Sequence, residues 1–330
     1  MSVTRFLIIR FSSIGDIVLT TPVIRQLKNS IEGEAEIHYF TKKEFAPILA
    51  SNPNIDKLHL FGENLSLALD EIEKIPFDYV IDLQNNYRSA MAKKRVKTLN
   101  FTVDKMNWKK YFLTGLGIRR FKIPHIVDRY LETIKGFGLK DDGLGLDFFV
   151  PQNDMIIPRS LDGKLDGKIV AFAVGGKHLG KVMPQEMQSD ICSKINAPIA
   201  LVGHGDADDE VAQYCAERNP NVVNLVNKLS LNQSASVVAQ AEVVLAGDTG
   251  LMHIAAAFGK KIVSVWGCTS PELGMSAYRS HESSIIIEPT KLRRRPCSKL
   301  GNRCRYGEVN RCITHNRTAV IAEAVNQRLS

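Results

Sequence analysis

The sequence predicts an α/β protein made of two doubly wound halves, each with a mostly parallel sheet between helices. Short, continuously apolar stretches alternate with segments whose apolar residues recur at helical spacing, first over residues 6–137 and again over residues 169–287. Uninterrupted apolar strands separated by helices are typical of buried parallel sheets with right-handed crossovers. Residues 150–167 lie between the two series and contain two prolines and two glycines, so they are expected to form a linker.

Each element of the first half follows from its apolar pattern and the turn residues around it. Pro22 interrupts the first helical pattern, so it either kinks that helix or marks a restart at the first helical position. The expected strands are residues 6–10, 37–40, 57–61 and 79–83, and the expected helices are residues 16–28, 45–50, 65–75 and 125–137.

The second half repeats this alternation. Its expected strands are residues 169–174, 198–203, 222–226, 243–246, 262–266 and 284–287, and its expected helices are residues 184–195, 208–218, 232–240 and 249–258. We expect two Rossmann-like domains, residues 1–155 and 165–313, with a ligand cleft between them. A last helix, within residues 314–330, is expected to follow the second domain and cross back onto the first.

Composition is ordinary for a soluble globular protein. The 330 residues are 44% hydrophobic and 24% charged, and no apolar run approaches the roughly 18 residues that span a bilayer. The N-terminus leads directly into a strand and lacks the apolar core of a signal peptide, so a cytoplasmic protein is expected. Cys192, Cys215 and Cys268 lie in apolar stretches and are expected to be core thiols.

The net charge of +8 is concentrated in two segments. Residues 85–124 contain eleven Lys or Arg against the single acid Asp104, and residues 291–317 contain nine against Glu308. The remainder of the chain is therefore acidic. Basic segments on an acidic protein suggest an anionic partner such as an acidic acceptor, a phospholipid surface or nucleic acid, while two solvated loops are the simpler alternative.

The loop after the first strand carries a carboxylate, Asp16, at a helix start. The loop, residues 10–16, lacks both the Gly-x-Gly-x-x-Gly pattern of dinucleotide sites and the Gly-Lys-Ser/Thr of a P-loop. Asp16 is therefore either the N-cap of the helix or a general base that faces substrate.

The second half opens with a glycine pair, Gly175–Gly176, that would let a ligand approach the backbone closely. Lys181 follows in the same loop and either binds an anion there or is solvated. Asp206, after the next strand, is placed to accept hydrogen bonds from a ribose diol. Asp208 and its neighbour Asp209 are interpreted as acids of a first helical turn rather than as part of a metal-binding D-x-D triplet.

The most informative stretch is residues 247–259, where a strand leads through a glycine turn into a helix. Asp248 occupies the expected N-cap position, which leaves backbone N–H groups at Thr249, Gly250 and Leu251 available to an anion, above all a phosphate. His253 lies one turn further along, beside the helix start. An ordinary capped helix is the alternative.

The C-terminal cysteines offer one further possibility. Cys297, Cys304 and Cys312 with His315 would provide three thiolates and an imidazole for zinc, but the spacing is loose and no C-x-x-C is present. Packed or reactive thiols are the favoured interpretation.

Two motifs, taken together, resemble the bacterial heptosyltransferase family, glycosyltransferase family nine. They are Arg10-Phe11-Ser12-Ser13-Ile14-Gly15-Asp16 with Thr20-Thr21-Pro22, and Asp248-Thr249-Gly250-Leu251-Met252-His253-Ile254-Ala255-Ala256; residues 125–131 resemble a further family segment. The resemblance covers nearly the whole chain. It implies a GT-B fold and inverting, metal-independent transfer, without a cofactor, from a nucleotide-diphosphate sugar. In the best-known members the donor is ADP-L-glycero-β-D-manno-heptose and the acceptor is the lipopolysaccharide inner core.

The resemblance also implies residue roles. Asp16 matches the family's proposed base, and Lys181 matches a lysine that contacts the donor. The other donor contacts that the resemblance implies are Asp206, Asp248, Thr249, Gly250, Leu251 and His253. Gly175 and Gly176 are expected donor contacts because of their accessible backbone, and the expected acceptor contacts are Ser12, Ser13, Arg88 and Arg129. This chain departs from the family at Gly175–Gly176, where hydroxyl residues are common, and at Met183, where an aromatic is usual.

The sequence thus favours transfer of a heptose or related sugar from an ADP-sugar to an acidic acceptor. The basic residues 85–124 would face that acceptor at the cytoplasmic side of the inner membrane, where the protein would bind peripherally. A nucleotide-sugar epimerase of the same fold, or a transferase with another nucleotide sugar, is the alternative. A nucleic-acid binder is suggested by charge alone, and no recognition motif supports it.

Overall fold

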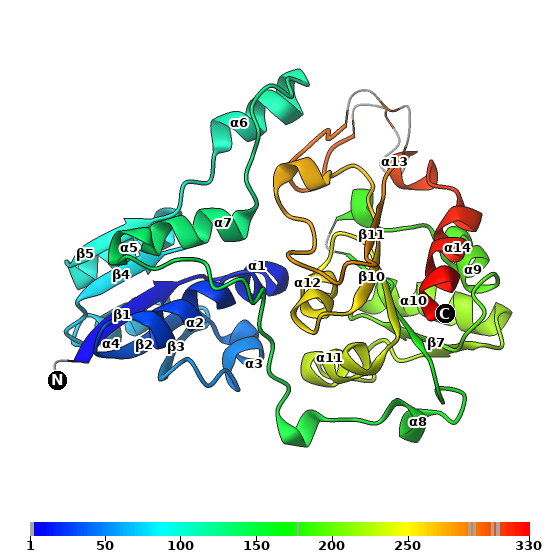
Figure 1. Cartoon of the computed structure of the whole chain (residues 1–330), viewed down its shortest axis with the longest axis horizontal. Coiled ribbons are helices and arrows are strands. Elements are labelled where there is room, and N and C mark those ends of the chain that lie inside the picture. The colour runs from blue at the N-terminus through cyan, green and yellow to red at the C-terminus, as the bar shows by residue number, and fades with distance from the viewer. Residues whose placement is uncertain (1–2, 177, 290–291, 293–294, 305–306, 308–310) are drawn as a thin grey trace. The chain divides into compact units, whose positions relative to one another are not determined.

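The computed structural model describes residues 3–176, 178–289, 292, 295–304, 307 and 311–330, and its contacts divide the chain into two compact units. The first unit contains Met1–Lys105 and Pro124–Phe149, and the second contains Met106–Ile123 and Val150–Ser330. Each unit has one parallel sheet with helices on either side of it (Figure 1). The expected α/β class is therefore confirmed.

The sheet of the first unit has the strand order β3-β2-β1-β4-β5. The chain leaves β1 in one direction to build β2 and β3, then returns to the other side of β1 for β4 and β5. The strands are β1 (Val3–Ile9), β2 (Glu34–Lys42), β3 (Lys57–Phe61), β4 (Tyr79–Asp82) and β5 (Leu99–Thr102). The helices are α1 (Ile14–Val18), α2 (Thr21–Ser30), α3 (Ala46–Leu49), α4 (Leu65–Ile72), α5 (Tyr87–Val96) and α7 (Ile126–Leu131), with 3₁₀ turns at Lys43–Phe45 and Glu132–Phe137.

The sheet of the second unit has the order β11-β10-β9-β6-β7-β8, again entirely parallel. Its strands are β6 (Val170–Ala173), β7 (Ile199–Val202), β8 (Val222–Asn224), β9 (Val243–Ala246), β10 (Lys261–Val265) and β11 (Ile285–Ile287). Its helices are α6 (Asn107–Tyr111), α8 (Pro158–Leu161), α9 (Gln185–Cys192), α10 (Asp206–Arg218), α11 (Leu231–Gln240), α12 (Gly250–Ala257), α13 (Arg311–Thr314) and α14 (Thr318–Leu329). A π-helical turn at Phe112–Leu116 and 3₁₀ turns at Gln152–Asp154, Leu179–Lys181 and Pro271–Leu273 complete it.

The central strands of both sheets are buried on both faces, as their apolar runs predict. Residues Phe6–Ile9 of β1 are fully buried, and so is every residue of β9. The expected core thiols Cys192, Cys215 and Cys268 are indeed buried. No helix within the described part of the chain is long and apolar enough to span a membrane.

Several elements differ from the sequence-based expectation. Pro22 marks a restart, because α1 ends at Val18 and α2 begins at Thr21 with the proline in its first turn. The expected helix 125–137 is α-helical only to Leu131 and continues as 3₁₀ turns. The sequence did not predict helix α5 or strand β5, because they contain mostly basic and polar residues and lack a clear apolar periodicity.

Two segments belong to a unit that the sequence pattern did not indicate, and only their tertiary contacts show it. Residues 106–123 leave the first unit and pack in the second, a grouping that the sequence pattern did not show. Helix α14 differs from the expected return to the first domain, since it packs against α9, β9 and β10 of the second unit. Its residues Ile321 and Val325 are fully buried in that core.

Candidate active site

Both sheets place a candidate loop at the point where the strand order reverses. In such sheets the carboxyl ends of the two strands beside the reversal diverge and leave room for a ligand. In the first unit this point lies between β1 and β4, and the loop after β1 contains Asp16. In the second unit it lies between β6 and β9, whose following loops contain Gly175–Gly176 and Asp248.

Asp16 is held by residues of its own loop. Its Oδ1 lies 2.8 Å from Nη2 of Arg10 in an ion pair, and its Oδ2 accepts a hydrogen bond from the Ser13 hydroxyl at 2.9 Å. The side chain keeps a quarter of its surface exposed, whereas that of Arg10 keeps a tenth. The carboxylate is therefore fixed in orientation and still reachable by a substrate.

Arg10 joins this loop to the neighbouring strand and helix. Its Nη1 donates to the carbonyl of Leu83 at 2.8 Å and to the hydroxyl of Tyr130 at 2.9 Å. Burial alone would lower the pKa of the Arg10 guanidinium, but the Asp16 carboxylate and the two nearby tyrosines raise it above its ordinary value. Burial raises the pKa of Tyr130 to about 12. Arg10 therefore stays charged and Tyr130 neutral, and the guanidinium balances Asp16.

Asp16 is not the N-cap of its helix, which corrects one of the two expectations. Ser13 is the N-cap of α1, and Asp16 is the third helical residue, whose carboxylate accepts a hydrogen bond from the Ser13 backbone N–H at 3.2 Å. The carbonyl of Ser12 accepts a hydrogen bond from Arg10 Nε at 2.8 Å. The structure thus uses Ser12 and Ser13 to organise the loop around Asp16.

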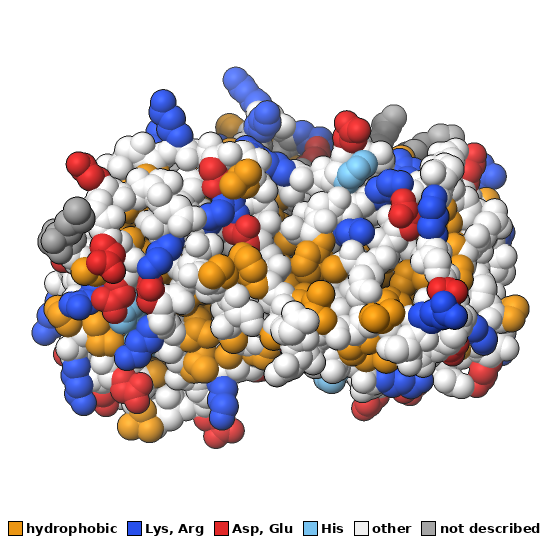
Figure 2. Space-filling model, turned by 60° about the horizontal axis from the view of Figure 1, so that its bottom comes forward, with side chains coloured by type: hydrophobic (Ala, Val, Ile, Leu, Met, Phe, Trp, Pro, Cys, Tyr) orange, Lys and Arg blue, Asp and Glu red, His pale blue; other side chains and the backbone are white. Residues whose placement is uncertain are grey.

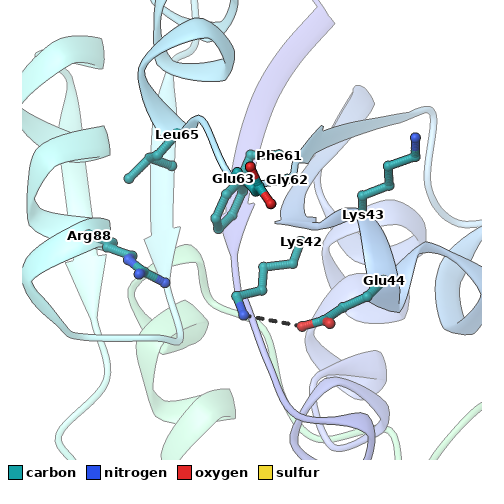
Figure 3. Close-up of a pocket in the computed structure, with 8 residues that line it drawn as sticks. All are labelled: Lys42, Lys43, Glu44, Phe61, Gly62, Glu63, Leu65 and Arg88. Atoms are coloured by element: carbon teal, nitrogen blue, oxygen red, sulfur yellow. Dashed lines mark hydrogen bonds and ion pairs between the residues drawn. The ribbon is translucent and has the colours of Figure 1, made fainter.

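Arg88 lines a pocket of about 620 Å³ at the carboxyl edge of the first sheet (Figure 3). Lys42 ends β2 and pairs with Glu44 at 3.1 Å, while the Arg88 guanidinium extends from α5 toward Lys42 and Phe61. The full lining is Lys42, Lys43, Glu44, Phe61, Gly62, Glu63, Leu65 and Arg88. Lys42 and Lys43 were not singled out from the sequence, although their place directly after a strand could have indicated them.

The start of α5 places Arg88. Asn86 caps this helix by accepting a hydrogen bond from the Ser89 backbone N–H at 3.0 Å. The fully buried Asp82 at the end of β4 accepts hydrogen bonds from the Asn85 backbone N–H and the Ser89 hydroxyl. Lys93 pairs with the same carboxylate at 2.9 Å. The helix that carries Arg88 is therefore tied to the strand end by a buried acid.

Arg129 is almost completely buried at 4% exposure. Its Nη1 donates to the backbone carbonyl of Lys105 at 3.1 Å, but its Nε and Nη2 have no hydrogen-bond partner among the described residues. Burial lowers the pKa of Arg129 against the opposing effect of nearby Tyr130, Asp104 and Asp128. Buried guanidinium donors without acceptors are costly, so this site favours an anionic ligand.

In the second unit Lys181 and Asp248 form an ion pair. Lys181 Nζ lies 2.6 Å from Asp248 Oδ2, and both side chains are mostly buried. The same carboxylate oxygen accepts a hydrogen bond from the Thr269 hydroxyl at 3.0 Å. The predicted neighbourhood of Lys181 and the 247–259 stretch is therefore present. The lysine ammonium is held beside the start of α12 rather than solvated.

The start of α12 lacks a side-chain cap. Thr249, not Asp248, is the N-cap residue, and its side chain makes no capping hydrogen bond. The Thr249 hydroxyl is buried and has no hydrogen-bond partner among the described residues. Gly250 and Leu251 are the first helical residues, and His253, one turn into the helix, is buried at 2% exposure. First-turn N–H groups of this eight-residue helix thus remain available to an anion.

The glycine loops bring an unexpected acid to this edge. A Cβ on Gly175 would overlap the carboxylate of Asp208, and one on Gly203 would lie within 3.2 Å of it. Burial raises the pKa of Asp208, against the backbone hydrogen bond and charge of His204. Asp206 is exposed at the first position of α10. Asp208 is an acid of the first turn of α10, as the sequence predicted, and its carboxylate also lies against Gly175. Gly176 lies beside Lys181 and Thr249.

Several residues of the second basic segment (residues 291, 293–294, 305–306 and 308–310) lie outside the described residues. The described C-terminal cysteines lie near Cys268. The pKa of Cys268 is raised to about 11 by burial and by the nearby thiols of Cys312, Cys297 and Cys304. All are free thiols. Among the described residues, which include His315, no three His, Cys, Asp or Glu side chains are arranged to hold a metal ion.

The sequence as a whole matches one known family. The profile of glycosyltransferase family 9 (heptosyltransferase) matches residues 69–301. The chain is 23% identical over 315 residues to lipopolysaccharide heptosyltransferase 1 of Campylobacter coli, covering 86% of this chain and 90% of that protein. It is 25% identical to lipopolysaccharide heptosyltransferase 3 of Escherichia coli, covering 77% of this chain and 81% of the relative.

Solved structures show the same fold. A glycosyltransferase family 9 protein of Veillonella parvula matches with a TM-score of 0.80 at 17% identity, over 99% of this chain and 97% of the other. ADP-heptose lipopolysaccharide heptosyltransferase II of Escherichia coli matches with a TM-score of 0.74 at 16% identity, over 99% and 98% of the two chains. The expected GT-B fold, with its Rossmann-like units, is thereby confirmed.

Proposed function

Because the chain belongs to glycosyltransferase family 9, we propose that it transfers a heptose from an ADP-heptose donor to an acidic acceptor of the lipopolysaccharide inner core. The names of its relatives support this substrate pair, since they are lipopolysaccharide heptosyltransferases, and one structural relative from Escherichia coli was solved with ADP. A single structural observation supports a diphosphate donor most strongly. At the start of α12, the Thr249 hydroxyl is buried, makes no capping hydrogen bond and has no partner among the residues that the structure describes, and Lys181 lies beside it.

The proposed donor site uses the second unit. The diphosphate would accept hydrogen bonds from the first N–H groups of α12, and Lys181 would contribute a charge-assisted bond. Asp248 fixes the ammonium of Lys181 for this purpose. We assign Asp208 rather than Asp206 to the hydroxyls of the nucleoside ribose, because Asp208 faces the Gly175 loop. His253 and Leu251 would line the sugar side of the site.

The proposed acceptor site uses the first unit. Arg129 would pair Nε and Nη2, which have no acceptor within the described part of the chain, with a carboxylate or phosphate of the acceptor. The three cations Lys42, Lys43 and Arg88 outnumber the two acids that line the same pocket, and Arg88 and Lys43 would bind a further anionic group. A negatively charged inner-core sugar would satisfy both features, which a neutral acceptor would not.

We propose that Asp16 acts as the general base. Its carboxylate takes the proton from an acceptor hydroxyl, the hydroxyl oxygen forms a bond to the anomeric carbon, and the bond from that carbon to the diphosphate breaks, so that ADP leaves with its electron pair. Attack opposite the leaving group inverts the anomeric centre. The α12 dipole and Lys181 would stabilise the charge on the departing diphosphate without a metal ion.

A ligand panel tests the donor assignment. Thermal-shift and calorimetric titrations would compare ADP-, GDP- and UDP-sugars on the complete protein. We expect ADP-heptose to give the largest stabilisation, and Lys181→Ala to remove most of it. Preferential stabilisation by a UDP-sugar would contradict the heptose assignment. Transfer to a soluble inner-core acceptor should continue in EDTA, and loss of transfer there would contradict the metal-free mechanism.

A further inference from the structure

The segment of residues 106–123 is unusual for its exposed apolar surface. Trp108, Tyr111 and Leu116 are exposed at 51%, 60% and 58%, and Ile118 is also exposed. These side chains lie on α6, the π-helical turn after it and the following loop. Four large apolar side chains exposed within eleven residues are the kind of surface that marks an interaction site with a protein or a membrane.

The opposite face of the segment is anchored in the second unit. Leu113 and Ile123 are buried in one cluster with Leu273. Arg119 pairs with Glu272 at 3.1 Å and also donates to the backbone carbonyl of Arg295. Lys299 donates to the amide oxygen of Asn107 at 3.0 Å. The segment is therefore held in place by these contacts while four of its large apolar side chains remain exposed to solvent.

The charges of the segment have a single sign. It contains five basic residues and no Asp or Glu: Lys109, Lys110, Arg119, Arg120 and Lys122. The face of the molecule drawn in Figure 2 has basic and acidic side chains interspersed instead. Exposed aromatic and aliphatic side chains among lysines and arginines match an anionic bilayer, because indole and phenol rings favour the headgroup region and cations are attracted to acidic lipids.

We infer that residues 106–123 dock the protein on the surface of an anionic phospholipid bilayer, with Trp108, Tyr111, Leu116 and Ile118 inserted among the headgroups. The inference deepens the proposed function and rests on it in one respect: a lipid-anchored acceptor gives the enzyme a reason to bind a bilayer. Single-stranded nucleic acid would also attract cations and aromatics. The aliphatic Leu116 and Ile118 favour the bilayer, because bases stack on aromatic rings and gain little from leucine.

The chain contains a built-in reporter for this contact. Of its two tryptophans, Trp266 is fully buried and Trp108 is half exposed. A change of tryptophan emission on adding vesicles therefore reports Trp108. We expect vesicles of phosphatidylglycerol and phosphatidylcholine to shift the emission to the blue and to sediment the protein. Pure phosphatidylcholine vesicles should do neither, and Trp108→Phe should abolish the spectral shift while sedimentation persists.

Two variants separate the apolar and ionic contributions. Arg120→Gln with Lys122→Gln should weaken partitioning onto the anionic vesicles about thirtyfold, since each surface cation contributes roughly a factor of five. Leu116→Ser with Ile118→Ser should reduce the blue shift and the sedimented fraction. Leu67→Ser is the matched control, because Leu67 on α4 of the first unit is 63% exposed, and it should bind like the parent protein.

The result is independent of sugar transfer, since the vesicles contain neither donor nor glycan acceptor. Equal binding to neutral and anionic vesicles, or unchanged binding of both double variants, would overturn the docking surface and leave the proposed function standing. A blue shift with single-stranded oligonucleotides but none with anionic vesicles would overturn it in favour of nucleic acid. If the parent protein bound anionic vesicles but transferred no heptose to an inner-core acceptor, the proposed function alone would be contradicted.

Discussion

The loops at the two points of strand-order reversal occupy the same place in the same topology but are built from different chemistry. In the first unit, side chains fill the loop: Arg10, Ser13 and Asp16 bond to one another and to the ends of neighbouring elements. In the second unit, Gly175 leaves room for the Asp208 carboxylate against the backbone, and the N-cap residue of α12 makes no side-chain capping hydrogen bond. The first loop presents a carboxylate, and the second presents N–H groups.

This difference follows from what each loop is proposed to bind. Proton transfer needs a titratable side chain in a fixed orientation, and the Arg10 ion pair supplies that orientation for Asp16. Binding a diphosphate needs several donors around one anion, which backbone N–H groups at a helix start supply with little reorganisation. The contrast suggests separate effects for variants of the two loops: those of the first should alter turnover, and those of the second should alter donor affinity.

The largest expected effect is on Asp16. Asp16→Asn keeps the shape of the side chain and removes the base, so kcat should fall roughly 10²–10⁴-fold. ADP release with saturating donor and acceptor measures it, with ADP affinity and melting temperature as controls. Turnover near that of the parent, in a folded protein, would remove the base assignment and with it the contrast between the loops.

The next effect concerns Lys181. Lys181→Ala should weaken ADP binding about 10–100-fold, because a bond between a charged donor and a phosphate typically contributes roughly 1.5–3 kcal/mol. Calorimetric titration with ADP measures the change. Lys228→Ala is the control, since this lysine of the same unit donates to the carbonyl of Asn224. A variant that bound ADP normally but turned over slowly would place Lys181 in catalysis instead.

A smaller effect is expected at Gly175. In Gly175→Ala, the added Cβ would overlap the Asp208 carboxylate. Because overpacking usually costs about 1–3 kcal/mol, the unfolding free energy should fall by that amount. Gly163→Ala is the matched control, because a Cβ there meets no atom within 4 Å. Chemical denaturation of both variants gives the comparison, and combining Gly175→Ala with Asp208→Ala should restore stability. Equal stabilities of the two single variants would show that the second loop tolerates side chains.

The smallest expected effect at neutral pH is on the unfolding free energy of the first unit, which should become sensitive to acid. His59 is buried beside His38, whose Nδ1 lies 2.8 Å from its Nε2. Burial, with the charges of His38 and Lys57, lowers the pKa of His59 to about 4. Its contribution to stability is therefore complete above about pH 6.5 and is lost as pH falls toward 4, at no more than about 1.4 kcal/mol per pH unit. His59→Leu should flatten that slope in pH-dependent denaturation, and an unchanged slope would contradict the assignment.

Local patterns predicted the parts of the site that depend on short stretches of sequence. The apolar runs located β1 and β9, and the residues after them located the loops that contain Asp16 and Thr249. The N-cap positions were predicted less well: Ser13 and Thr249 occupy the N-cap positions of α1 and α12 instead of Asp16 and Asp248. In both cases the acid is held by a cation, Arg10 or Lys181, and sequence spacing does not reveal such partners.

By itself, the sequence determined the α/β class, the two-part alternation and the candidate loops, because a strand's apolar run and a glycine turn are properties of neighbouring residues. Only the tertiary structure showed that Asp208 lies against Gly175, that residues 106–123 pack in the second unit, and that two donors of the buried Arg129 have no acceptor among the described residues. These contacts join residues far apart in the chain or depend on which face of an element is buried. They follow from the way the sheets fold rather than from any local period.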